Sequence, residues 1–369
     1  MKKTILILVA VITGWLAAGA TLPDNDIDYP LRDATTPLRG DVNLDGRVNI
    51  GDVTTLINYL LSNEWPAPTY TYSIEKLWEV TDLSFMTTTE VRQGFGMNGK
   101  FYINDKTAKR ILVVDEHGLT DTTYPGGANA AITRDEAGNL IVSNTTFPTP
   151  WEWNTPTITV INPNTDEVKT YAVPEKCGMS GRCDYLGFAK GNLMQDGTIA
   201  FSGYTSTGIS VLAITGGEVN LDSSFNLICD GPIPSATTVV NYYTDLAGQE
   251  ALLYVNRQPA PVKITFDGSD FVPTTILLPN KGFAHGVFPF VWGDKELFLY
   301  ASLPNYQDGF AVAEAGAEEP IATHAPTVTE NANGFTADWL NAEVINEDEV
   351  IIYQYYPGGY IAVCRLTRS

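Results

Sequence analysis

The chain has 369 residues, of which 44% are hydrophobic, so it can bury a sizeable core in one large or two ordinary domains. Its formal net charge of −21 argues against a nucleic-acid partner, because binding to a phosphate backbone requires a basic surface. We interpret the charge as the acidic surface of an exported protein, which also suits cation binding.

The N-terminus has the three parts of a secretory signal. Two lysines precede an apolar run over residues 5–18, and an Ala-x-Ala cleavage site ends at Ala20. We therefore predict a signal peptide over residues 1–20. No later segment approaches about 18 unbroken apolar residues, so we predict no membrane span after signal removal. No cysteine lies near the cleavage site, and we expect a secreted, periplasmic or cell-surface protein that is not a lipoprotein.

Oxygen-bearing side chains recur at alternate positions after a polar linker over residues 21–38. Counting Asp41 as the first position of a twelve-residue loop places Gly46 sixth, where a calcium loop turns sharply. Ca²⁺ takes six to eight oxygen ligands, and alternate side chains of such a loop converge on one ion. The predicted ligands are Asp41, Asn43, Asp45, the Arg47 carbonyl, Asn49 and Asp52.

A helix is predicted directly after this loop, because apolar residues at 53, 56, 57, 60 and 61 have helical spacing. The twelfth loop residue is Asp where an ordinary EF-hand has Glu, and no helix precedes the loop. Residues 40–61 therefore resemble a single dockerin type I repeat more than a calmodulin-like hand. The resemblance implies a calcium-binding module over residues 39–65, with Ca²⁺ as its cofactor and a cohesin-like partner.

Dockerins that bind cohesins generally carry two repeats, and this sequence has one. Three interpretations therefore stay open: calcium that only folds the module, a docking role, and a relic site without metal.

Short strands dominate residues 70–369. Candidate hairpin turns fall at 98–99, 137–138, 196–197, 248–249, 293–294 and 347–348. An apolar strand follows each turn, and a further strand follows each of those after a loop. A repeat of roughly 40 to 60 residues in an all-β chain predicts a six-bladed β-propeller with four-stranded blades. A β-sandwich pair is the alternative fold, but it does not explain six similar segments.

The run at residues 71–80 has no partner in the first repeat, whereas the sixth repeat lacks a fourth strand. We predict that this N-terminal strand completes the last blade and closes the ring, which removes an exposed sheet edge.

One end of such a propeller gathers the connections between blades and those between second and third strands, and it is the expected binding face. Two tryptophans on a proline-stiffened loop offer flat surfaces on which sugar rings or peptides stack. The predicted ligand-binding residues are Trp151, Trp153, Tyr204, Arg257, His285 and Tyr306. Other side chains expected on this face are Arg92, Asn104, Asp105, Arg182, Asp184, Tyr185, Tyr355 and Tyr356.

Signatures of catalysis are sparse, since the sequence has no nucleophile elbow, zincin motif or Walker loop. His285 is the one candidate acid or base on the predicted face. Carboxylate pairs from different blades leave no spacing signal. The leading hypothesis is an exported glycan- or protein-binding propeller associated with polysaccharide utilisation. The alternative is a propeller-fold polysaccharide hydrolase or lyase, so whether the protein is an enzyme stays open.

Four cysteines add limited constraints. Cys177 and Cys183 flank a short glycine-containing loop and either form a disulfide or stay reduced. Cys229 and Cys364 adjoin or lie in apolar strands, so both are predicted to be small core residues. No C-x-x-C spacing exists, which excludes zinc-ribbon and thioredoxin-like sites.

Overall fold

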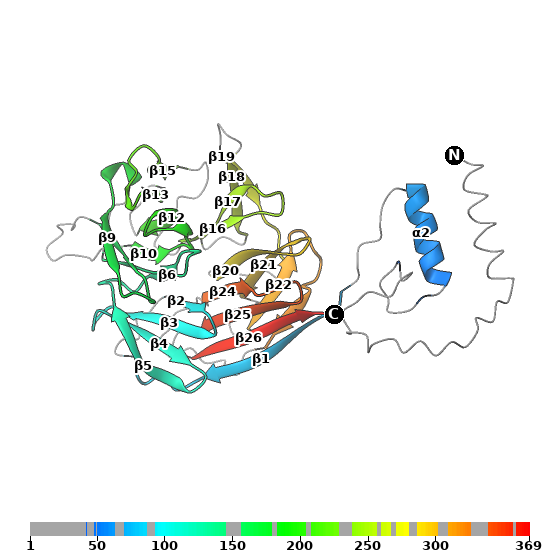
Figure 1. The fold of residues 1–369 in the computed structure, drawn as a ribbon, viewed down its shortest axis with the longest axis horizontal. Coiled ribbons are helices and arrows are strands. Elements are labelled where there is room, and N and C mark those ends of the chain that lie inside the picture. Colours follow the sequence, from blue (N-terminus) through cyan, green and yellow to red (C-terminus); the bar gives the residue numbers. More distant parts are fainter. Residues whose placement is uncertain are drawn as a thin grey trace, which may run out of the picture. The chain divides into compact units, whose positions relative to one another are not determined.

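The computed structural model describes residues 42, 48, 50–62, 70–86, 93–144, 156–178, 183–203, 208–228, 238–256, 260–266, 271–279, 286–301, 309–325, 339–356 and 359–369 (Figure 1). The chain forms two compact units, Met1–Thr69 and Tyr70–Ser369, and each is described by itself.

The N-terminal unit contains helix α2 (Ile50–Ser62), which confirms the helix predicted after the oxygen-rich loop. Asp52 lies in its first turn, where a carboxylate interacts favourably with the helix dipole. Val53, Leu56 and Ile57 are partly buried, as their spacing on one side of the helix predicts.

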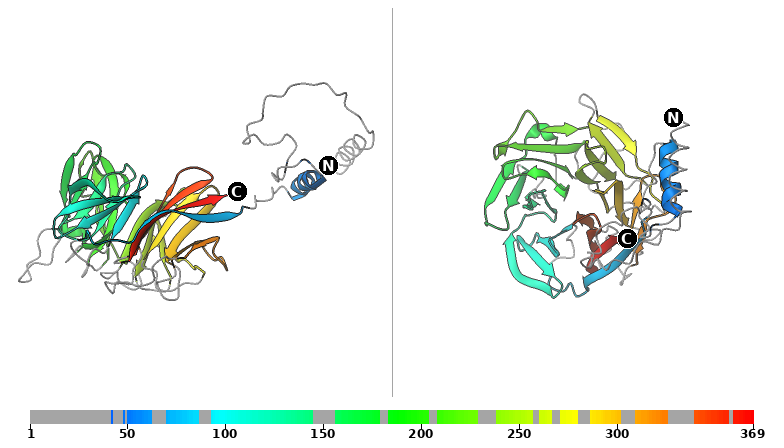
Figure 2. Two further views of the ribbon diagram at one scale, coloured as in Figure 1. Left: turned by 90° about the horizontal axis from the view of Figure 1, so that it is seen from below. Right: turned by 45° about the vertical axis from the view of Figure 1, so that its right-hand side comes forward.

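The C-terminal unit is a ring of six antiparallel sheets, or blades, which Figure 2 (right) shows around a common centre. The first blade is formed by β2 (Gly94–Met97), β3 (Lys100–Asp105), β4 (Arg110–Asp115) and β5 (Gly118–Pro125). The second is formed by β6 (Ile132–Arg134), β7 (Leu140–Ser143), β8 (Thr157–Ile161) and β9 (Val168–Ala172). The third follows a short 3₁₀ helix, η1 (Glu175–Cys177), and is formed by β10 (Cys183–Leu186), β11 (Lys190–Asn192), β12 (Asp196–Gly203), β13 (Ile209–Thr215), β14 (Glu218–Val219) and β15 (Phe225–Leu227).

The other three blades repeat the four-stranded pattern. The fourth is formed by β16 (Thr238–Thr244), β17 (Glu250–Asn256), β18 (Val262–Phe266) and β19 (Phe271–Thr275). The fifth is formed by β20 (Val287–Trp292), β21 (Lys295–Ala301), β22 (Phe310–Glu314) and β23 (Ala322–His324). The sixth is formed by β24 (Trp339–Val344), β25 (Glu349–Tyr356), β26 (Tyr360–Arg368) and the N-terminal strand β1 (Tyr72–Val80).

Strand β1 closes the ring as predicted. It pairs antiparallel with β26, from Tyr72 opposite Arg368 to Val80 opposite Ile361. The six-bladed propeller with an N-terminal closing strand is therefore confirmed. Because the larger apolar clusters each join residues of two or more blades, a single blade could not bury its own faces.

Hairpin geometry explains why the blades were recognisable in the sequence, with one exception. Asn98 and Gly99 have φ values of 52° and 72°, the positive angles that a tight two-residue turn requires. The prediction at residues 196–197 was wrong, since Asp196 and Gly197 begin β12 and residues 193–195 form the turn. Asp196 instead accepts a hydrogen bond from the Gly216 amide at 2.9 Å, which fixes the next turn of the blade.

Three cysteines among the described residues are buried and reduced. Cys177 and Cys183 form no disulfide with each other, so of the two alternatives the structure has the reduced one. The Cys177 thiol donates to the Val211 carbonyl at 3.3 Å. Cys364 is a buried core residue as predicted, and Cys229 lies outside the described residues.

The two ends of the propeller differ in their connections. We call turn face the end that carries the turns between first and second strands, such as Asn98-Gly99 and 345–348. We call loop face the opposite end, which carries connections such as 144–156 between β7 and β8.

Candidate functional site

The loop that precedes α2 is closed by Asp52. Its side chain is 3% exposed, and its Oδ1 accepts a hydrogen bond from the Val42 amide at 2.7 Å. This bond links the two ends of the predicted calcium loop. A buried carboxylate needs donors or a countercharge, and Ca²⁺ would supply the charge.

The other predicted metal ligands, Asp41, Asn43, Asp45, Arg47 and Asn49, lie outside the described residues. Among the residues that the structure does describe, no three His, Cys, Asp or Glu side chains gather in a group that could hold a metal ion. Asp52 fits a calcium loop by its position and burial, and the ligand set stays a prediction.

The predicted ligand-binding residues of the loop face also lie beyond the described part of the chain. These are Trp151, Trp153, Tyr204, Arg257, His285 and Tyr306. The same holds for Arg92, Arg182 and the side chain of Asp184, which were also expected on this face. Their placement on the loop face stays a prediction.

Asn104 was expected on the loop face; it lies at that end of β3, where it is fully buried and holds the connection between the first two blades. Its Nδ2 donates to the carbonyls of Gly127, at 3.1 Å, and Asn129. Its Oδ1 accepts from the Gly127 amide at 3.0 Å. An asparagine at a strand end here satisfies backbone groups that would otherwise be buried without partners.

The remaining described members of the expected face are also buried. Asp105 accepts hydrogen bonds from the amides of Thr107 and Ala108, at 3.1 and 3.0 Å, and so closes its own turn. The Tyr185 ring packs 5.0 Å from that of Trp339, and Tyr355 and Tyr356 are 1% and 3% exposed. These side chains belong to the loop-face end of their blades, as expected, but they are buried beneath its surface.

The propeller axis is nearly filled by side chains. The cavity between the innermost strands has a volume of about 10 Å³, which is the space of about one water molecule. Phe95 and Phe188 stack at 6.2 Å, and the Arg134 guanidinium lies 5.5 and 5.2 Å from the two ring centroids. At this level of the axis, the described side chains leave room for about one water molecule, so the faces of the propeller offer more space for a ligand.

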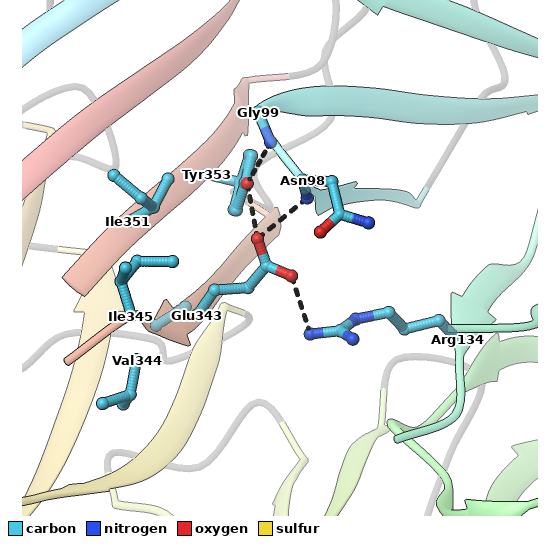
Figure 3. Close-up of a pocket in the computed structure, with 9 residues that line it drawn as sticks. Asn98, Gly99, Arg134, Glu343, Val344, Ile345, Ile351 and Tyr353 are labelled. Carbon is cyan, nitrogen blue, oxygen red and sulfur yellow. Dashed lines mark hydrogen bonds and ion pairs between the residues drawn. The ribbon is translucent and has the colours of Figure 1, made fainter. Parts of the chain in front are cut away.

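A pocket of about 340 Å³ opens on the turn face, where three blades meet (Figure 3). Glu343 lies at its centre, and its carboxylate is 3.1 Å from an Arg134 nitrogen. The other carboxylate oxygen accepts from the Asn98 amide at 2.9 Å and from the Tyr353 hydroxyl at 2.7 Å. The Tyr353 hydroxyl in turn accepts from the Gly99 amide at 2.8 Å.

This network joins the first, second and sixth blades across the ring closure. Burial lowers the pKa of Arg134, whereas burial and the adjacent Glu343 carboxylate raise the pKa of Tyr353. Burial also raises the pKa of nearby Tyr102 to about 12. Because Glu343 already bonds three partners, the network holds blades together and leaves little of that carboxylate for a ligand.

Sequence reasoning missed Arg134, Glu343 and Tyr353. The Asn98-Gly99 turn was a visible signal, but a pairing between residues of different blades has no fixed spacing in the sequence.

Residues 39–76 match the dockerin type I domain. The match extends into β1, where residues 72–76 pair with β26, so its C-terminal part belongs to the propeller and not to a second repeat. The chain therefore has a single dockerin copy followed by a six-bladed propeller. No helix in the described part of the chain is long and apolar enough to cross a membrane.

No curated protein matches the chain. A solved DUF4623 family protein from Bacteroides eggerthii is similar with a TM-score of 0.54 and 11% identity, over 83% of this chain and 78% of that chain. The N-terminal domain of Nup159 is similar with a TM-score of 0.40 and 9% identity, over 80% of this chain and 96% of that chain. The likeness to the Bacteroides protein shows a common fold alone.

Proposed function

We propose that the protein is an exported propeller that binds a glycan or protein on its loop face and carries an N-terminal calcium-dependent docking module. The dockerin match over residues 39–76 carries this proposal. Dockerin modules are typically extracellular and bind cohesins, so the match favours a role on an assembled extracellular scaffold. A glycan ligand would associate the protein with polysaccharide utilisation.

Asp52 supports the calcium part of the proposal. It is the last of the predicted ligands, and it is buried at the point where α2 begins. Asp41, Asn43, Asp45, the Arg47 carbonyl and Asn49 would supply the remaining oxygens of the loop. Bound Ca²⁺ would neutralise these carboxylates and so allow the loop to fold against the helix.

The closed axis supports a ligand site on the loop face. With room for about one water at the centre, the propeller offers its faces for recognition. On the turn face, the Glu343 carboxylate in the pocket is already bonded to Arg134, Asn98 and Tyr353. The two tryptophans between β7 and β8 lie outside the described residues, and we place them on the loop face as part of this proposal because their flat rings are suited to stacking on a sugar ring.

Calorimetry with the mature, chelator-treated protein tests the metal site. We expect Ca²⁺ binding in the wild type and its loss in Asp45→Ala and Asp52→Ala. Asp121→Ala, an exposed carboxylate in β5, is the matched control and should bind Ca²⁺ as the wild type does. Unchanged affinity in the two loop variants would refute the assigned ligands.

A combined glycan-array and hydrolysis screen tests the ligand. Retention without product supports a binding protein, and product formation supports the alternative hydrolase or lyase, which stays a prediction. If no glycan is retained and no product forms, a carbohydrate role is contradicted, and the ligand of the proposal is then a protein.

A further inference from the structure

We propose that Tyr70, Arg368 and Trp292 form a clamp that keeps the ring closed where the N-terminal linker joins it. The importance of such a clamp rests on the proposed function, because a docked N-terminal module would pull on the propeller through this linker. The contacts themselves belong to the propeller alone.

Arg368 is the centre of the clamp. Its guanidinium carbon lies 4.4 Å from the Tyr70 ring centroid and 4.9 Å from that of Trp292. The residue is 8% exposed, and a cation on an aromatic ring is attracted more strongly when water is excluded. Its Nε has no hydrogen bond among the described residues and lies 4.0 Å from the exposed Asp348 carboxylate. Contact with the two rings therefore contributes more than hydrogen bonding to holding this side chain.

The clamp joins three parts of the ring. Tyr70 is the first described residue of the propeller, Arg368 ends β26, and Trp292 ends the first strand of the fifth blade. Thr71 and Ser369 exchange two backbone hydrogen bonds beside it, at 2.9 and 3.0 Å. The two ends of the propeller chain and a neighbouring blade thus meet at one arginine.

Neighbouring groups are shaped to accept this arginine. Gly293 has a φ of 62°, and a Cβ there would lie 2.6 Å from Nη1 of Arg368. The Trp292 indole nitrogen donates to the Asn346 carbonyl at 2.9 Å, which fixes the ring against the turn of the sixth blade. Tyr72 packs 5.9 Å from Trp292 and fills the remaining side.

The position of the clamp determines its effect. Residues 63–69 connect α2 to Tyr70, so a pull through them reaches β1 at the Thr71 and Tyr72 pairs before any other. A strand detached from this end would open the sixth blade. The clamp lies at this end of β1, on the turn face, so opposing detachment there also protects the loop face from distortion.

Hydrogen–deuterium exchange of the mature protein tests the clamp without any ligand or docking partner. In Arg368→Ala we expect the amides of residues 72–76 to exchange about tenfold faster, which corresponds to about 1.4 kcal/mol. Arg365→Ala is the matched control, because Arg365 lies on the same strand in a solvent-exposed pair with Glu75. Its exchange should stay within about twofold of the wild type, since exposed ion pairs contribute little.

Equal exchange in the two variants would overturn the proposal. Should Arg368→Ala fail to fold, exchange of residues 72–76 is measured in Arg368→Lys and Tyr70→Leu instead. Each of these removes the stacking of the planar guanidinium on the Tyr70 ring and keeps most of the side-chain volume. Pulling on the chain by its two termini provides a second measurement, since the Thr71–Ser369 pair bears the load first. The first opening force should fall in Arg368→Ala and not in Arg365→Ala. The outcome is independent of calcium and glycan, so the clamp and the proposed function can fail separately.

Discussion

The turn face and the loop face of this propeller use polar residues for different purposes. On the turn face, Glu343, Arg134 and Tyr353 bond one another and the Asn98-Gly99 turn across three blades. On the loop face, the described polar residues, such as Asn104, support the backbone from beneath. The predicted ligand-binding residues belong to connections outside the described residues, and their place on this face stays a prediction. The comparison suggests that stability is concentrated on one face and recognition on the other.

The strongest test of this division is the removal of Glu343. Glu343→Ala leaves Arg134 nearly buried without its partner, which should lower the free energy of unfolding by about 3 kcal/mol. Urea denaturation measures the loss. Glu347→Ala, an exposed carboxylate in the adjacent turn, should change it by less than about 0.5 kcal/mol. Similar losses in both variants would show that the network does not hold the ring.

A smaller loss is expected at Asn341, which joins the sixth blade to the first. Its side chain accepts from the Gly96 amide at 2.8 Å and donates to the Gly96 carbonyl at 2.9 Å. Asn341→Ala leaves both buried groups unpaired and should cost about 2 kcal/mol. Urea denaturation measures this loss. Asn164 is an exposed turn residue, so Asn164→Ala is the control for a general effect of removing an asparagine. An unchanged unfolding midpoint in Asn341→Ala would show that these two hydrogen bonds do not stabilise the contact between the sixth and first blades.

The sequence predicted the blades because their signals are local. The positive φ of Asn98 and Gly99, and the alternation of the following strands, require no knowledge of distant residues. The turn at 196–197 was placed wrongly because Asp-Gly also suits the start of β12, where the Asp196 side chain holds a neighbouring turn. Glu343 and Arg134 were missed because their pairing exists only after the ring closes.

The candidate site likewise has one part with a local sequence signal and one part without. The predicted calcium loop has a local signal, since all six predicted ligands lie within twelve residues, and its last member, Asp52, is buried at the start of a helix. On the loop face, residue type alone could not separate a predicted ligand-binding tyrosine such as Tyr204 from the buried Tyr185, because Tyr185 is buried against Trp339 of another blade.

A weaker test concerns His324, near the loop-face end of the fifth blade. Burial, and then Lys76, lower the pKa of His324, so the folded state favours the neutral ring. The unfolded state binds the proton more readily, and stability should therefore decrease as the pH falls below the ordinary histidine pKa of about 6.5. Urea midpoints between pH 8 and pH 5 measure the decrease, and His324→Gln should flatten it. If the urea midpoint depends on pH in the same way in the wild type and in His324→Gln, a group other than His324 is responsible for the decrease.

The smallest effect on stability and the largest on recognition are expected together in the connection between β7 and β8. We predict that Trp151→Ala/Trp153→Ala changes the free energy of unfolding by less than about 0.5 kcal/mol. Binding of this double variant to a glycan array, beside the wild type and the turn-face variant Arg365→Ala, tests most directly whether recognition belongs to the loop face. We predict that the wild type and Arg365→Ala retain a glycan that the double variant loses. Retention by the double variant, or loss in Arg365→Ala, would contradict the assignment of recognition to the loop face.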